Sequence, residues 1–366
     1  MSWIIEPRDT LVVRDGRPIR ERGAMRSVDF PWPSTVAGLV RTRLLSDPAT
    51  GRFTGTPHEA RRIPVAGPLL ARLGPNGQGE ELLVPAPRDC LWQAPEGERE
   101  VLVRHRLVPA ATPEPGVQTD LPSGLQLVRP LQDPGTGKAS QGPAFWTWSE
   151  LEHWLCEPEP QRRYPAPGGR LSFGHPGLVR ERRVHVAIAA ESQTAAEGQL
   201  YSVEGLRFAD RQERYGLWFR CDDPRLQPGT VPCGGERRLS WLRRAALPAP
   251  PPPQGLRPER TMRVVLLTPA LFAQGALPQG CQIAGARVVA VCVPRPEPIS
   301  GWDLERRGPK RTRWMVPAGS VYFVDVEGFM SGESWQQWLH AVWMQCISDA
   351  EQDRLDGFGL CVVGVG

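Results

Sequence analysis

Residues 6–41 constrain the fold most, because a short strand, a polar turn and a helix are expected there in direct succession. Residues 11–13 (LVV) include two β-branched valines and are too few for a helix, which is typical of a buried strand. Asp15-Gly16 favours a turn, since glycine accepts positive φ. Ser34 or Thr35 is then expected to cap a helix whose apolar residues recur at helical spacing.

The turn in this segment carries Arg14, Arg17, Arg20 and Arg22. We expect these arginines to lie near the amino-terminal end of the helix, where free amide groups and partial positive charge favour an anion. A phosphate backbone would suit such a place. A solvated basic loop beside an amphipathic helix explains the same residues, and the local sequence leaves both interpretations open.

Arginine supplies almost all of the positive charge. The chain has 44 basic residues and a net charge of +4, and Lys138 and Lys310 are its only lysines. Arginine matches phosphate oxygens with a planar fork and stacks on bases, which suits a nucleic-acid partner. A GC-rich coding sequence produces the same bias, so composition alone does not decide the partner.

The cysteines and the apolar runs indicate a cytoplasmic protein without a metal or a membrane span. The eight cysteines are dispersed, with neither a CxxC pair nor zinc-ligand spacing to a histidine, and are expected to be reduced core residues. No apolar run approaches the roughly 20 residues that a membrane helix needs. Residues 1–18 lack the pattern of a signal peptide.

Later segments predict further strands and helices. Residues 63–73 and 82–84 flank a Gly-Pro-Asn-Gly run and are expected to form a hairpin, and residues 200–208 are expected to pair with 215–219. Helices are expected at 235–246 and at 334–347, the second with tryptophans along one buried face. The proline- and glycine-rich residues 109–142 predict a long loop.

The 366 residues suffice for two domains. The order of strands and helices predicts an α+β fold made of two tandem ferredoxin-like (RRM-like) βαββαβ domains with insertions. We expect residues 1–180 to form the first, with inserted hairpins and a loop. Residues 181–366 would form the second, with a glycine-rich segment at 357–359.

Several runs resemble one family. Residues 6–9 (EPRD), 14–18 (RDGRP) and 30–38 (FPWPSTVAG) are similar to the third subunit of the type III-B CRISPR effector, the Cmr complex, in the RAMP superfamily of CRISPR RNA-binding proteins. Residues 169–174, 194–201 and 316–322 are similar in the same order, so the resemblance spans nearly the whole chain.

The resemblance implies tandem ferredoxin-like domains and a non-catalytic role. Such a subunit would hold the 5′ handle of the CRISPR RNA and link the large polymerase-like subunit to the backbone subunits, with target RNA nearby. In RAMP proteins the glycine-rich loop before the last strand touches RNA, which implies that role for Gly357, Phe358 and Gly359. This loop is shorter than the family's fuller versions and is also typical of a helix stop.

A second basic cluster lies at residues 305–314, where Trp302 and Trp314 could stack on bases or pack beneath the loop. With the segments above, the candidate RNA-binding residues are Arg8, Arg14, Arg17, Arg20, Arg22, Ser34, Thr35, Arg41, Arg182, Arg183, His185, Arg306, Arg307, Lys310, Arg311, Gly357, Phe358 and Gly359.

Catalysis has little support in the sequence. We find no nucleophile motif, phosphate-binding loop or clustered carboxylates for metals, and predict no enzymatic activity, cofactor or metal. The alternative is a metal-independent endoribonuclease that processes CRISPR RNA with His105, His175 or His185. A third hypothesis is a protein-interaction module that makes no RNA contact.

Overall fold

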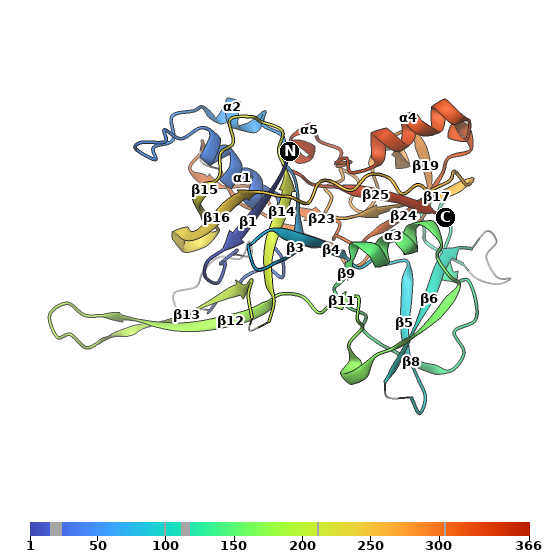
Figure 1. The fold of residues 1–366 in the computed structure, drawn as a ribbon, viewed down its shortest axis with the longest axis horizontal. Coiled ribbons are helices and arrows are strands. Elements are labelled where there is room, and N and C mark those ends of the chain that lie inside the picture. Colours follow the sequence, from blue (N-terminus) through green and yellow to red (C-terminus); the bar gives the residue numbers. More distant parts are fainter. Residues whose placement is uncertain (15–23, 99, 111–117, 211, 304) are drawn as a thin grey trace. The chain divides into compact units, whose positions relative to one another are not determined.

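The computed structural model describes residues 1–14, 24–98, 100–110, 118–210, 212–303 and 305–366. Within these residues the chain is a mixed α and β protein built mainly of antiparallel sheets (Figure 1). The expected mixture of helices and strands is confirmed. The finer assignment to two ferredoxin-like domains stays a prediction.

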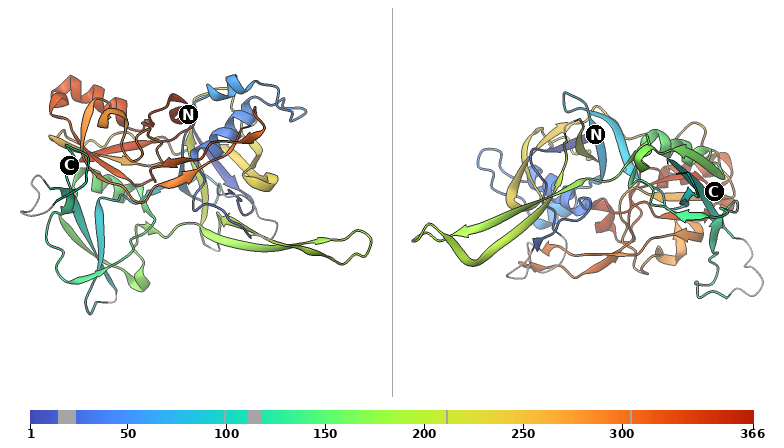
Figure 2. Two further views of the ribbon diagram at one scale, coloured as in Figure 1. Left: turned by 180° about the vertical axis from the view of Figure 1, so that it is seen from behind. Right: turned by 90° about the horizontal axis from the view of Figure 1, so that it is seen from below.

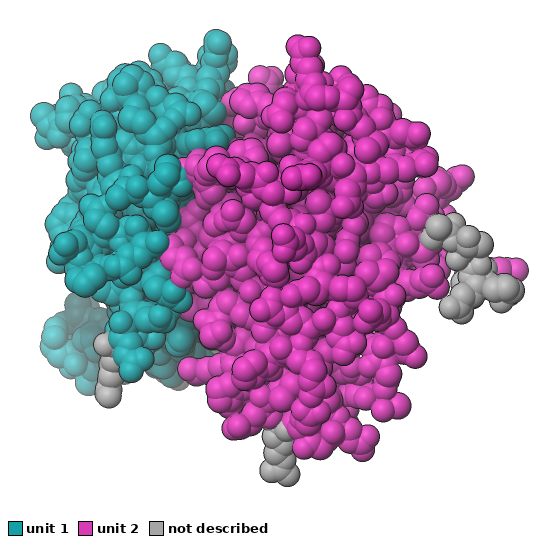
Figure 3. Space-filling view, turned by 45° about the vertical axis from the view of Figure 1, so that its right-hand side comes forward, with its two compact units in different colours: residues 1–80, 177–248, 298–313 teal, residues 81–176, 249–297, 314–366 magenta. Residues whose placement is uncertain are grey.

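The chain forms two compact units, each assembled from three separate segments (Figure 3). Unit 1 comprises Met1–Glu80, Gly177–Pro248 and Pro298–Arg313, and unit 2 comprises Glu81–Pro176, Ala249–Glu297 and Trp314–Gly366. The predicted boundary at residue 180 lies close to Gly177, but there the chain returns to unit 1 instead of starting a new unit. Pairing between strands far apart in the sequence causes this interleaving.

The sheet of unit 1 is built around β1 (Ser2–Pro7). Its strand order is β3 (Ala66–Leu73), β14 (Arg214–Arg220), β1, β16 (Arg238–Arg244) and β15 (Gly229–Cys233), with antiparallel neighbours throughout. Trp3, Ile4 and Ile5 of β1 are fully buried, so this central strand is covered on both faces. Helix α1 (Pro33–Leu44) packs on β3 and β15 through Val36, Ala37, Leu39 and Val40.

Three local expectations in unit 1 are wrong. The first strand is β1, whereas residues 11–13 contribute only an isolated bridge between Leu11 and Leu206. The segment expected as a basic helix forms strand β16, because Ser240 and Leu242 alternate into the core while the strand pairs with β1. Residues 200–207 pair with the strand that precedes them, whereas Phe208 alone of this segment accepts a backbone bond from Tyr215, at 2.7 Å.

That preceding strand builds a long hairpin, in which β12 (Val179–Ile188) pairs with β13 (Ala195–Arg207). The short strand β2 (Ala24–Met25) adds to β13 in parallel. Figures 1 and 2 show the far end of the hairpin projecting from the rest of its unit. Unit 1 also contains α2 (Pro57–Arg61), β21 (Trp302–Asp303) and β22 (Gly308–Pro309).

Unit 2 has two main sheets. The first has the order β18 (Gln282–Ile283), β19 (Ala286–Cys292), β24 (Val321–Asp325), β17 (Thr261–Leu266) and β25 (Cys361–Val365). Helices α3 (Trp148–Cys156) and α4 (Gly332–Val342) both pack on β25, and α5 (Glu351–Leu355) precedes it. The second has the order β10 (Gln161–Pro165), β6 (Val101–Pro109), β5 (Cys90–Pro95) and β8 (Gly137–Ala139), with β7 (Val128–Pro130) on β6.

The remaining strands connect these parts. β4 (Gly79–Pro85) follows β3 through the predicted Gly74–Gly77 turn and pairs with it, which confirms that hairpin. β9 (Phe145–Thr147) pairs with both β4 and β11 (Gly174–His175). β20 (Glu297–Ile299) and β23 (Arg313–Met315) include residues at which the chain passes between units. The helix expected at 334–347 is α4, and its tryptophans Trp335 and Trp338 are buried as predicted.

The described residues contain no group of histidine, cysteine or acidic side chains that could hold a metal ion. All eight cysteines are free thiols. No helix in the described part of the chain is long and apolar enough to cross a membrane.

Candidate nucleic-acid interface

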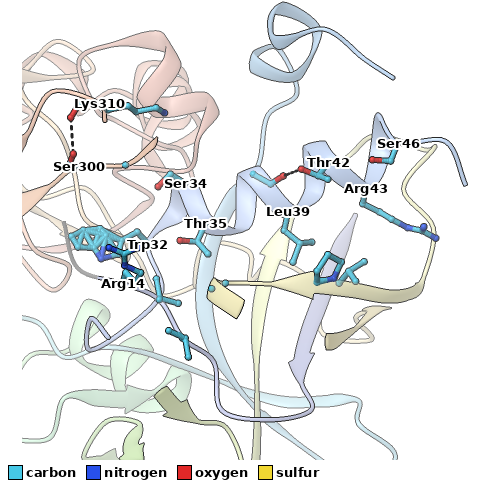
Figure 4. A pocket seen from close by; sticks show the side chains of 18 of the residues that line it. Arg14, Trp32, Ser34, Thr35, Leu39, Thr42, Arg43, Ser46, Ser300 and Lys310 are labelled. Atoms are coloured by element: carbon cyan, nitrogen blue, oxygen red, sulfur yellow. Dashed lines mark hydrogen bonds between the residues drawn. The ribbon is translucent and has the colours of Figure 1, made fainter. Parts of the chain in front are cut away.

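A cavity of about 920 Å³ lies beside α1 in unit 1 (Figure 4). One wall is the outer face of α1, and the other is β15 with the turn that follows it and residues 12–13. Ser300, Gly301 and Lys310, from the segment around β21 and β22, complete it. We call this cavity the α1–β15 groove.

The start of α1 opens onto the groove without a side-chain cap. The N-cap residue is Trp32 and Pro33 takes the first helical position, so the expectation that Ser34 or Thr35 caps the helix is wrong. Proline is favoured there because its missing N–H would have no partner anyway. Trp32, Ser34 and Thr35 all line the groove, so the first helical turn can meet a ligand.

Positive side chains stand at the two ends of the groove. Arg14 and Lys310 are exposed at one end, and half-buried Arg43 lies at the other, with its Nη2 3.5 Å from the Pro228 carbonyl oxygen (Figure 4). Arg17, Arg20 and Arg22, which we predicted to act with Arg14, lie outside the described residues.

Arg41 is not part of this interface, which corrects the prediction that it contacts RNA. Its side chain lies on the buried side of α1, 9% exposed, and its guanidinium donates to the Ile63 carbonyl oxygen at 2.9 and 3.2 Å. Helical phase explains the error, since Arg41 lies four residues after the buried Ala37 and so shares its face of α1. Arg8 is exposed, with its guanidinium 5.1 Å from the Trp241 ring centre, and stays a candidate.

The prediction that the glycine-rich segment at 357–359 contacts RNA is also corrected. It is buried, and all three of its amide groups donate within the protein: Gly357 to Arg354, Phe358 to Asp353 and Gly359 to Pro269. The Phe358 side chain is 1% exposed. Amides with internal partners cannot reach a phosphate, so this segment is the end of α5 and the approach to β25.

The basic cluster between β21 and β23 is held by its backbone. The Asp303 carboxylate accepts from the amides of Glu305 and Arg306 at 2.9 and 3.1 Å, and these bonds lower the pKa of Asp303. Arg306, Arg307, Lys310 and Arg311 remain exposed, as does Trp314. A fixed turn that leaves its cations in solvent can bind an anion at little ordering cost.

The β12–β13 hairpin carries Arg182, Arg183 and His185, the other predicted RNA contacts. Arg182 is exposed, whereas Arg183 pairs with Asp9 at 2.7 Å and with Glu181 at 2.6 Å. The His185 ring stacks on Tyr201 with centroids 5.3 Å apart. The other face of the projecting end exposes four apolar side chains, Val184, Val186, Ile188 and Leu200.

Asp9 ties the base of the hairpin to β16, because it pairs with both Arg183 and Arg238. The hydrogen bond from Arg183 lowers the pKa of Asp9 from 3.8 to about 2. A depressed carboxyl pKa means that the ion pairs stabilise the fold above about pH 4 and lose that effect as the pH falls towards about 2.

Asp9→Asn is therefore expected to speed amide hydrogen exchange in β12 and β13 at neutral pH and to abolish the extra loss of protection between about pH 4 and pH 2. The effect should be modest because the Asp9 side chain is 41% exposed. Asp29→Asn is the control, since Asp29 pairs with Arg180 but is 94% exposed. Equal exchange in the wild type and Asp9→Asn would show that Asp9 does not hold the hairpin.

The three histidines of the nuclease hypothesis are dispersed. His105 is 1% exposed and shares a 3.0 Å hydrogen bond with Gln93, and its burial lowers its pKa. It cannot reach an RNA strand from this position. His175 packs against Phe145 in unit 2, whereas His185 belongs to unit 1.

Sequence reasoning missed several groove residues, among them Thr42, Arg43, Ser46, Thr230 and Pro232. Thr42 and Arg43 belong to α1, whereas Thr230 and Pro232 belong to β15, which is far from α1 in the sequence. The pairing of β15 with β16 brings these two segments together. Gly38 was the signal in the sequence that could have indicated the groove. A glycine in the middle of a helix destabilises it by about 0.5–1 kcal/mol relative to alanine, so its presence suggests another role.

Comparisons with known proteins give one family. A family model described as CRISPR-associated protein (Cas_Cmr3) matches residues 3–366. No curated protein matches the sequence.

Two solved structures contain similar chains. One is described as the cryo-EM structure of the Type III-B Cmr-beta bound to cognate target RNA; its chain has a TM-score of 0.51 and 16% identity over 99% of this chain and 96% of that chain. The other is described as Cmr-beta bound to cognate target RNA and AMPPnP, state 1, with a TM-score of 0.50 and 17% identity over 88% of this chain and 86% of that chain. At these identities the likeness shows a shared fold.

Proposed function

Because the chain belongs to the Cmr3 family of CRISPR-associated proteins, we propose that it is a non-catalytic, RNA-binding subunit of the type III-B Cmr effector. It holds the 5′ handle of the CRISPR RNA and links the large polymerase-like subunit to the backbone subunits. The similar chains in Cmr-beta structures support membership of such a complex. Two ferredoxin-like domains in the RAMP manner, and a cytoplasmic location, are part of the same proposal.

The observation that carries this proposal is the α1–β15 groove. It combines an uncapped helix start with exposed cations, and the basic segment around Lys310 adds Arg306, Arg307 and Arg311. Phosphate contacts from such groups fix the register of a nucleic acid, while base edges supply sequence information. The alternative endoribonuclease gains no support from the geometry, since His105 is enclosed.

Replacing Arg14 and Lys310 together by serine is expected to weaken binding of single-stranded RNA. Each lost phosphate contact makes the slope of log K against log salt shallower by about 0.7, so the double variant should lose about 1.4. Fluorescence anisotropy of the full-length chain with handle RNA, at several salt concentrations, measures both quantities.

Lys138→Ser is the matched control, because Lys138 is the only other lysine and is exposed on β8 in unit 2. The control should keep the wild-type affinity and slope. If the double variant also keeps both, Arg14 and Lys310 do not contact the RNA.

A further inference from the structure

We propose that the α1–β15 groove takes nucleobases of single-stranded RNA into its interior and leaves the phosphates at its charged ends. This inference rests on the proposed function. It adds the orientation of the strand, and it assigns the groove to reading bases rather than to following a phosphate backbone.

The first argument is the distribution of polarity. The walls of the groove are largely apolar, formed by Val12, Val13, Leu39, Val231 and Pro232, with the Trp32 ring at one end. Among the described residues that line it, the cations Arg14, Lys310 and Arg43 stand at the ends (Figure 4). A phosphate between such apolar walls would lose hydration away from the cations, whereas the flat face of a base loses little. The apolar middle therefore suits bases.

The second argument is Gly38. This residue is exposed in the middle of α1, has no positive φ, and a Cβ added to it would have no atom within 4 Å. Neither the backbone conformation nor the packing of the protein requires glycine here, yet glycine weakens the helix. What its missing side chain provides is free space in the groove, which is consistent with room kept for a ligand.

The third argument is the set of hydroxyl groups on the same helical face. Ser34 and Thr42 each lie four residues from Gly38 and share its face of α1, and Ser46 lines the groove just beyond the end of the helix. The Ser46 hydroxyl oxygen is buried and has no hydrogen-bond partner in the described part of the chain. The Thr42 hydroxyl donates to the Gly38 carbonyl oxygen at 2.8 Å and keeps its acceptor capacity. Such groups can bind the edges of a base.

The wall of the groove formed by α1 also has the length of an oligonucleotide segment. From Ser34 to Arg43 the helix rises about 14 Å at 1.5 Å per residue. This is longer than one base, so the groove accommodates a short run of nucleotides rather than a single extruded one.

Gly38→Leu tests the inference, because a Cβ at this position meets no atom within 4 Å and leucine favours the helix, so the variant should fold with its side chain in the groove. The probes are four homopolymeric RNA octamers and an abasic ribose-phosphate octamer that carries the same phosphates. Binding is measured by anisotropy with the full-length chain and repeated with the assembled complex.

The wild type should bind at least one homopolymer about tenfold or more tightly than the abasic strand, as expected from stacking of one or more bases. Gly38→Leu should remove this advantage and leave the abasic affinity within about twofold. Gly332→Leu at the start of α4, where a Cβ also meets nothing, is the control and should behave as the wild type.

Equal wild-type affinity for the abasic strand and the best homopolymer would overturn the base-inward orientation but leave RNA binding intact. A base-dependent advantage that survives Gly38→Leu would place base reading elsewhere and would also overturn the inference. Absence of binding to every octamer, in the assembled complex as well as the isolated chain, would instead overturn the proposed function.

Discussion

Asp89→Ala is expected to lower the free energy of unfolding by about 3–5 kcal/mol, the largest effect among the substitutions considered, because it leaves a buried guanidinium without its counter-charge. Asp89 and Arg263 pair with each other and both side chains are fully buried. Arg263 also donates to the carbonyl oxygens of Trp154 and Val365, and Asp89 accepts from the Trp154 indole at 3.1 Å. The pair thus joins α3, β17 and β25 in unit 2.

Differential scanning calorimetry should show the melting temperature of Asp89→Ala falling by about 10 °C. Arg263→Met combined with Asp89→Ala should be no less stable than Asp89→Ala alone, since an apolar replacement of both partners removes the unpaired charge. Glu305→Ala is the exposed control: it breaks the 2.9 Å pair with Arg61 and should cost less than about 1 kcal/mol. A loss for Asp89→Ala as small as that control's would contradict this role.

Gly234→Ala is expected to destabilise unit 1 by about 2–4 kcal/mol and to displace one wall of the α1–β15 groove. Gly234 has a φ of +68°, and a Cβ there would lie 2.5 Å from the Val12 carbonyl oxygen. The substitution therefore adds left-handed strain to a collision with backbone that cannot move freely. The same Val12 oxygen accepts from the Gly235 amide at 2.6 Å. A displacement of the Val12 backbone would therefore also move Gly235, and both residues line the groove.

Gly51→Ala separates the two contributions. Gly51 also lines the groove and has nearly the same φ, +66°, but a Cβ there meets nothing within 4 Å. It should cost only the strain of about 1–2 kcal/mol, whereas Gly234→Ala should cost more and also lose RNA affinity. Equal stability of the two variants in urea unfolding would contradict the close contact at Gly234.

Local sequence patterns predicted the elements whose stability is local. Helix α1 follows from its apolar spacing, and the β3–β4 hairpin follows from the Gly74–Gly77 turn between two apolar runs. The tryptophans of α4 were predicted to be buried for the same reason. In each case the pattern of residues within the element is enough to predict it.

Elements fixed by distant partners were not predictable in this way. The arginine-rich β16 is a strand only because β1 and β15 flank it, and the pattern within it does not contain that information. Gly357 and Gly359 looked like an exposed loop because the packing of β25 under α3 and α4 is invisible in the local sequence. The groove was missed because its walls come from segments that meet only in the folded unit.

The central claim is that the α1–β15 groove holds CRISPR RNA. Its most direct test is a photo-crosslinking amino acid in place of Thr42, which lines the groove and is exposed, in the assembled complex. The account predicts adducts to bases of the 5′ handle, with none from the same amino acid in place of Lys138. Adducts to protein alone from position 42 would contradict the account and favour a protein-interaction module.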